Sequence, residues 1–194
     1  MQPTSIVKER ATSIHNAFAS AIALIGKFDE DLINQVLATL GQGDTSKDLI
    51  CVYCGDVATA ADHLNGLVVE KQYSGNGQVI GNLVPCCNPC NSKKGNRPWR
   101  DWCDRLEDFT QEQRDQLGEW EALAPPVVSH KELLELHPDL MGEYERLKNV
   151  CLETMAEADK IATEIQRREK KRRVDEVLGG IAGPDEPRDS DEPM

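Results

Sequence analysis

Two pairs of cysteines have the spacing of metal ligands. Cys51 and Cys54 form one Cys-x2-Cys pair, and Cys87 and Cys90 form the other. Each pair offers two thiolates at tetrahedral geometry, and four thiolates complete the coordination of a structural zinc ion. Cys86 competes with its neighbour Cys87, but only Cys87 keeps the two-residue spacing to Cys90. The spacing therefore predicts one structural Zn²⁺ bound by the two pairs.

A carboxylate and an imidazole stand side by side between the cysteine pairs. Asp62 directly precedes His63, and Asn91 directly follows the last cysteine of the second pair. A site closed by four sulfurs has no place for a substrate, so a catalytic ion would bind elsewhere. The oxygens of Asp62 and Asn91 are ligands that suit a hard ion such as Mg²⁺ or Mn²⁺. On an extended segment His63 points away from Asp62, which leaves its ring free to take a proton from water.

Short strands and turns are expected to position these side chains. Residues 66–70 and 78–80 are apolar enough to pair as strands, and Ser, Gly and Asn in residues 74–77 predict a turn between them. Residues 99–106 have a helical pattern. The predicted order is cysteine pair, strand, strand, cysteine pair and helix.

Helical periodicity fills the chain on either side of this segment. Apolar residues recur at helical spacing in residues 11–25 and 29–40. Thr110 with Gln113, and Ser129 with Glu132, are capping-box pairs that predict the starts of two further helices.

Residues 139–178 carry a heptad pattern. Apolar and small residues step by four and three from Leu140 to Ile165. One interpretation is a long helix packed on its own domain, and the other is a coiled coil with a second copy, which makes a homodimer through residues 139–178. Residues 167–173 hold six basic residues and one acid, which indicates either a solvated helix face or a contact to phosphates.

The cysteine pairs, Asp62 with His63, Asn82, and Asn91 after the last cysteine together resemble the HNH family of ββα-metal nucleases. The resemblance covers residues 51–100. It implies that His63 is the general base that activates water and that Asp62 is a metal ligand. It also implies that Asn82 is the middle residue of the motif, whose side chain braces the loop that carries His63.

The chain departs from the strict family pattern at two places. Asn91 stands where the pattern has its last histidine, so the resemblance implies an oxygen ligand there in place of an imidazole. Asn65-Gly66 stands where many relatives have a proline soon after the histidine.

Basic residues cluster where the family's helix meets DNA, with no acid among them. Their cationic groups can neutralise phosphates, and the plainer alternative is a solvated helix start. These residues are Lys93, Lys94, Arg97 and Arg100.

The composition sets limits on the function. The chain has 194 residues and a net charge of −12, so any contact to phosphates must come from a local basic patch. Aromatic residues make up only 5%, and a structural metal would compensate for such a lean core. No export segment or membrane-spanning stretch is evident, which predicts a cytoplasmic protein without a membrane partner and with reduced thiols. Two further cysteines, Cys103 and Cys151, are expected to be buried small hydrophobes.

These patterns predict an α+β fold, in which a small zinc-stapled ββα-metal unit is embedded in a mostly helical chain. The predicted segments are a helical scaffold at 1–48, the HNH domain at 49–108, a helical region at 109–178 and a disordered acidic tail at 179–194.

The expected function is metal-dependent hydrolysis of phosphodiester bonds in DNA. His63 would be the general base, and a Mg²⁺ or Mn²⁺ ion would bind Asp62 and Asn91. Two alternatives stay open: a catalytically silent, zinc-stabilised module that binds nucleic acid, and an interaction protein built on the long helix.

Overall fold

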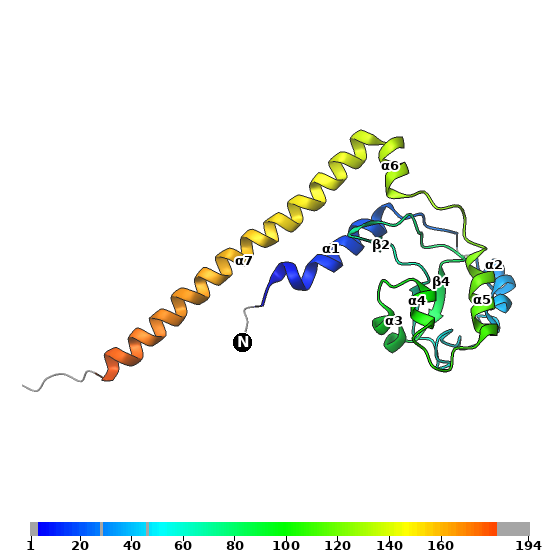
Figure 1. Ribbon diagram of the computed structural model, residues 1–194, viewed down its shortest axis with the longest axis horizontal. Coiled ribbons are helices and arrows are strands. Elements are labelled where there is room, and N and C mark those ends of the chain that lie inside the picture. The colour runs from blue at the N-terminus through cyan, green and yellow to red at the C-terminus, as the bar shows by residue number, and fades with distance from the viewer. Residues whose placement is uncertain (1–3, 28, 46, 182–194) are drawn as a thin grey trace, which may run out of the picture. The chain divides into compact units, whose positions relative to one another are not determined.

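The structure is a computed structural model that describes residues 4–27, 29–45 and 47–181 (Figure 1). Helices predominate in this part of the chain and short strands occur only in its middle, so the α+β class is confirmed. Among these residues no helix is long and apolar enough to cross a membrane.

The chain divides into two compact units, residues 10–149 and residues 1–9 with 150–194. The predicted boundaries at residues 48, 108 and 178 do not fall at this division, because helices on both sides of the cysteine-rich segment belong to the same unit as that segment.

An antiparallel strand pair and one helix form the centre of the larger unit. Strand β1 (Ala60–His63) pairs with β4 (Leu83–Cys86), and the register sets His63 opposite Leu83. Helix α3 (Asn88–Lys94) follows β4 and packs on β1. Strand β4 and helix α3 lie close together in Figure 1.

The prediction of the second strand was wrong. Residues 78–80 form an isolated bridge and a turn in place of a strand, with Gln78 bridged to Ile25. The cysteine pairs explain the difference. One pair precedes β1 and the other begins directly after β4, so bringing the four cysteines together aligns β1 with β4.

The predicted strand at residues 66–70 is present only in part. Strand β2 (Val68–Val69) pairs with β3 (Gln72–Tyr73). The turn between them is Glu70-Lys71, with φ of 50° and 68°. A two-residue hairpin loop of type I′ has left-handed backbone at both positions, which matches the twist of its strands. The turn was expected at residues 74–77 because Gly and Asn, rather than Glu and Lys, usually adopt this conformation.

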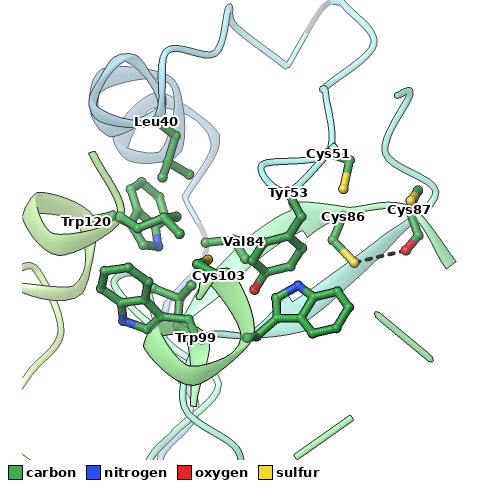
Figure 2. Close-up of a cluster of buried hydrophobic side chains, with 12 residues drawn as sticks. Leu40, Cys51, Tyr53, Val84, Cys86, Cys87, Trp99, Cys103 and Trp120 are labelled. Atoms are coloured by element: carbon green, nitrogen blue, oxygen red, sulfur yellow. Dashed lines mark hydrogen bonds between the residues drawn. The ribbon is translucent and has the colours of Figure 1, made fainter. Parts of the chain in front are cut away.

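The core of the larger unit joins aromatic side chains to the cysteines. Helices α4 (Trp99–Cys103) and α5 (Gln111–Glu121) each contribute buried indole rings. Figure 2 shows Cys51 and Cys87 on the side of this cluster that lies away from Trp120. The metal-ligand candidates are therefore part of the same packed cluster as the aromatic rings. Its buried members include Leu40, Cys51, Tyr53, Leu64, Val84, Cys86, Cys87, Trp99, Trp102, Cys103, Leu117 and Trp120.

The local helix signals in the sequence are confirmed. Helix α2 (Glu30–Leu37) begins at Asp29, whose carboxylate accepts a hydrogen bond from a backbone amide, and the 3₁₀ turn η1 (Ala38–Leu40) follows it and packs against α5. Both predicted capping boxes form, at the start of α5 and at the start of α6 (His130–Leu136).

The long C-terminal helix, α7 (Pro138–Ile181), is also confirmed. On the predicted heptad seam Leu140 is 74% exposed and Ile161 63% exposed, and Cys151 is exposed rather than buried as expected. The seam is thus uncovered at these positions in a single chain, and the homodimer stays a prediction. The helix includes residues 179–181, and the rest of the expected disordered tail lies outside the described residues.

In the smaller unit, a carboxylate of the C-terminal helix caps the start of the N-terminal helix. Helix α1 (Ile6–Ile22) starts next to Asp159 of α7, whose carboxylate accepts hydrogen bonds from Ser5, Ile6 and Val7. A carboxylate at a helix N-terminus satisfies free backbone amides and is favoured by the helix dipole.

Candidate metal centre and nucleic-acid site

The four cysteines of the two Cys-x2-Cys pairs come together. Their sulfur atoms all lie within 4.8 Å of one another, and Cys54 Sγ is 3.6 Å from Cys87 Sγ. They are close enough to hold a metal ion, as their spacing predicted. Cys86 takes no part in this group. Its thiol is buried in the core and donates a hydrogen bond to the carbonyl of Cys87 (Figure 2).

Local backbone geometry presents the two cysteine pairs. After Cys54 the chain reverses at Gly55, whose φ of 81° places its amide on the carbonyl of Cys51 at 2.9 Å. Cys87 is the N-cap residue of α3, and Cys90 lies in the first turn of that helix. The turn thus directs the sulfurs of Cys51 and Cys54 toward a common point, and the start of α3 directs those of Cys87 and Cys90 to the same point.

The thiols of this cluster affect one another's ionisation. Burial, followed by hydrogen bonds with Cys87 and Cys54, raises the pKa of Cys90. The backbone N–H of Cys90 lowers the pKa of Cys87. Because crowded thiols resist joint ionisation, a bound cation is needed to keep all four as thiolates.

Asp62 lies on β1, where its carboxylate is sealed from solvent. The residue is 4% exposed, and its Oδ2 accepts a hydrogen bond of 2.7 Å from the Tyr53 hydroxyl. The same oxygen is 3.0 Å from the Nζ of Lys94. Burial and then the Asp62 charge raise the pKa of Tyr53, which therefore stays a neutral donor. Tyr53 was not identified from the sequence, where a tyrosine between two cysteines was the only signal.

Lys94 differs from its expected place on a basic surface. Its side chain is fully buried, and its ammonium group donates a hydrogen bond to the backbone carbonyl of His63 in addition to its ion pair with Asp62. The prediction that Lys94 contacts phosphates is therefore wrong for this conformation, because its charge is directed into the protein.

His63 follows Asp62 on β1, so the two side chains leave opposite faces of the strand as expected. Burial lowers the pKa of His63, Asp62 raises it, and Lys94 lowers it, with a net value below the ordinary 6.5. Its Nε2 atom is buried without a hydrogen-bond partner among the described residues. A buried polar atom without a hydrogen-bond partner is uncommon in a folded protein and calls for an explanation.

Asn82 holds the segment directly after His63. Its side-chain oxygen accepts a hydrogen bond of 2.9 Å from the amide of Asn65, and its side-chain nitrogen donates to the carbonyls of Asn65 and Gly77. Its backbone carbonyl accepts from Leu64 at 2.8 Å. The residue is 3% exposed, so it fixes the chain on the C-terminal side of His63 from within the core.

Asn91 lies on α3 and faces β1. Its side-chain nitrogen donates a long hydrogen bond, 3.4 Å, to the carbonyl of Ala61, next to Asp62. Asp62 and Asn91 therefore offer a carboxylate and an amide on two elements that pack together. This oxygen chemistry fits a hard divalent ion, although Asp62 already has a cationic partner in Lys94.

The remaining basic residues keep an exposed position, but two of them have partners. Arg97 donates to the carbonyls of Lys93 and Lys94, which caps the end of α3. Arg100 pairs with Glu121 at 2.7 Å and lies 4.3 Å above the Trp99 ring. Lys93 is exposed on α3. The expected patch thus consists of Lys93, Arg97 and Arg100.

Comparisons with known proteins add no assignment. No protein-family model matches the chain, and no curated protein or solved structure is significantly similar to it.

Proposed function

We propose that the protein is a metal-dependent endonuclease of the HNH type that hydrolyses phosphodiester bonds in DNA. The observation that carries this proposal is the network around Asn82, which fixes the residues after His63 on the strand pair. The resemblance assigns that bracing role to this asparagine. The order of β1, β4 and α3, with Asp62 and His63 on the first strand and Asn91 on the helix, supports the same interpretation.

In the proposed reaction, His63 takes a proton from the attacking water. The lowered pKa keeps its ring neutral at pH 7, as a general base requires. Asn82 keeps the ring in position through the backbone of the following residues. Lys93, Arg97 and Arg100 supply positive charge for the DNA backbone. A divalent ion held by Asp62 and Asn91 would supply charge for the reacting phosphate when it is bound.

The four-cysteine site has a different role in this proposal. We assign Zn²⁺ to it, because four thiolates in tetrahedral reach are the ligand set of structural zinc sites. The ion would join the segment before β1 to the start of α3, and so fix the distance between Asp62 and Asn91.

The test is plasmid cleavage by purified protein with Mg²⁺ or Mn²⁺. His63→Ala should lower the cleavage rate by roughly 10²- to 10⁴-fold and should keep metal content and DNA affinity. His137→Ala is the matched control, since this exposed histidine lies outside the site and its loss should leave the rate unchanged. Cleavage at the wild-type rate by His63→Ala would overturn the proposal.

The pH profile of cleavage tests the protonation state of the base. Because the pKa of His63 lies below its ordinary value of 6.5, the neutral form persists into mildly acidic solution. Cleavage should therefore fall off only below pH 6.5. A rate that already declines above pH 7 would place the titrating base elsewhere.

A second function is favoured by one observation. Lys94 neutralises Asp62 in the described conformation, which suits a module that binds nucleic acid without cutting it. DNA binding without cleavage at any divalent ion concentration would support that alternative.

A further inference from the structure

Lys94 and Asp62 form a buried ion pair at the position where the nuclease proposal needs a metal ligand. The lysine side chain is fully buried and the carboxylate side chain is 5% exposed. Burying a charge is unfavourable unless it is paired, and removing one partner leaves the other uncompensated. The pair is therefore held together by the low polarity of its surroundings as well as by its own attraction.

The second contact of Lys94 makes its position specific. The ammonium group also donates to the carbonyl of His63, so it bridges the two residues of the Asp62–His63 motif. With the Tyr53 hydroxyl on the same carboxylate oxygen, Asp62 has two donors before any ion arrives. A divalent cation that binds this oxygen would meet an ammonium group already within 3.0 Å of it, and two cations at such separation repel each other.

We propose that Lys94 is a built-in counter-cation of Asp62, which a divalent metal ion must displace in order to bind. This inference rests on the proposed metal site at Asp62 and Asn91. Lys94 stabilises the metal-free state through its ion pair with the Asp62 carboxylate, and it therefore sets the affinity of the site for the metal ion. Lys94 is the last residue of α3 and is followed by Gly95 at a φ of 56°. Displacement would take its buried ammonium group away from both Asp62 and the carbonyl of His63.

The direct test is Mn²⁺ binding to the full-length, zinc-loaded chain, followed by electron paramagnetic resonance. Lys94→Met keeps an unbranched side chain, one atom shorter, and removes its charge. A unit charge within about 4–6 Å changes a neighbouring ionic equilibrium by roughly 10- to 1000-fold, so the variant should bind Mn²⁺ at least about tenfold more tightly than the wild type. Equal affinity in the two proteins would overturn the inference.

Two controls tie the effect to Asp62. The double variant Asp62→Asn with Lys94→Met should lose the added affinity, because the carboxylate that gained access is gone. Lys93→Met, at the exposed neighbouring position, should bind Mn²⁺ as the wild type does. An equal gain in the Lys93 variant would attribute the effect to the general surface charge and would contradict the proposal.

A second measurement uses the wild-type chain, and so does not depend on the variants folding. Amine-reactive labelling with mass spectrometry should modify Lys93 readily and Lys94 slowly. Saturating Mn²⁺ should increase the labelling of Lys94 and leave that of Lys93 unchanged. If Lys94 stays protected when Mn²⁺ is bound, the ion does not displace it.

The outcome is separable from that of the nuclease test. Tighter Mn²⁺ binding by Lys94→Met together with no plasmid cleavage by the wild type would support the counter-cation and reject the nuclease. Cleavage that depends on His63, with the same Mn²⁺ affinity in the wild type and in Lys94→Met, would support the nuclease and reject the counter-cation.

Discussion

The four-cysteine cluster and the Asp62 site balance negative charge in opposite ways. The cluster brings four sulfurs within 4.8 Å of one another, and in the described part of the chain no ammonium or guanidinium group is hydrogen-bonded to them. Asp62 has its cation from the chain itself, through Lys94 at 3.0 Å, and a neutral donor in Tyr53. One site therefore needs an added metal ion to reach its stable state, whereas the other is compensated without one.

This difference separates what each site contributes to the protein. A metal that completes a site adds its binding free energy to folding. An internal ion pair adds little net stability, but the loss of either partner is costly. We therefore expect removal of zinc to unfold the surrounding segment, and removal of Mg²⁺ or Mn²⁺ to leave the fold intact.

Cys90→Ser should have the largest effect. Structural zinc binding is worth roughly 10–16 kcal/mol in small zinc-finger peptides, which is comparable with the whole stability of a domain, about 5–15 kcal/mol. We expect the variant to lack zinc and to lose the cooperative thermal transition of residues 10–149, as measured by metal analysis and circular dichroism.

Cys151→Ser provides the matched control, because that thiol is exposed on α7 and lies outside the cluster. The control should contain about one zinc ion per chain and melt as the wild type does. A folded Cys90→Ser protein with an unchanged melting temperature would show that the cluster is dispensable for folding, and the contrast between the two sites would fail.

Lys94→Met should have the second-largest effect on stability. Without the ammonium group, the Asp62 carboxylate is buried without a charged partner, and breaking such a pair costs about 3–5 kcal/mol. Chemical denaturation of the zinc-loaded protein should report this loss. Asp62→Asn in the same chain should recover part of it, because both charges are then removed. If the double variant is less stable than Lys94→Met, Asp62 is not the partner that matters.

The sequence predicted those features that depend on local spacing. The cysteine pairs, the capping boxes at Thr110 and Ser129, and the long helix each follow from residues within one or two turns of one another. In each case the signal and the structure involve residues that are near one another in the sequence.

The pairing of β1 with β4 and the burial of Lys94 could not be predicted from local spacing. The partner of β1 is fixed by closure of the cysteine cluster over a long loop, rather than by the apolar pattern of residues 66–80. Lys93 and Lys94 look equivalent in sequence, but consecutive helix residues point about 100° apart. One therefore faces solvent and the other faces β1. Only the packing of α3 on β1 decides which.

Lys93→Ala should have the smallest of the expected effects. Lys93→Ala removes an exposed charge without a buried partner, so its stability should stay within about 0.5 kcal/mol of the wild type. If Lys93 contacts a phosphate, the slope of log affinity for DNA against log salt concentration should become shallower by about 1. Lys94→Met should leave that slope unchanged while it lowers stability, because its charge faces Asp62. Fluorescence anisotropy with a short duplex across a salt series measures both slopes. A shallower slope for Lys94→Met would mean that Lys94 leaves the ion pair when DNA binds, whereas unchanged slopes for both variants would remove Lys93 from the proposed DNA-binding surface.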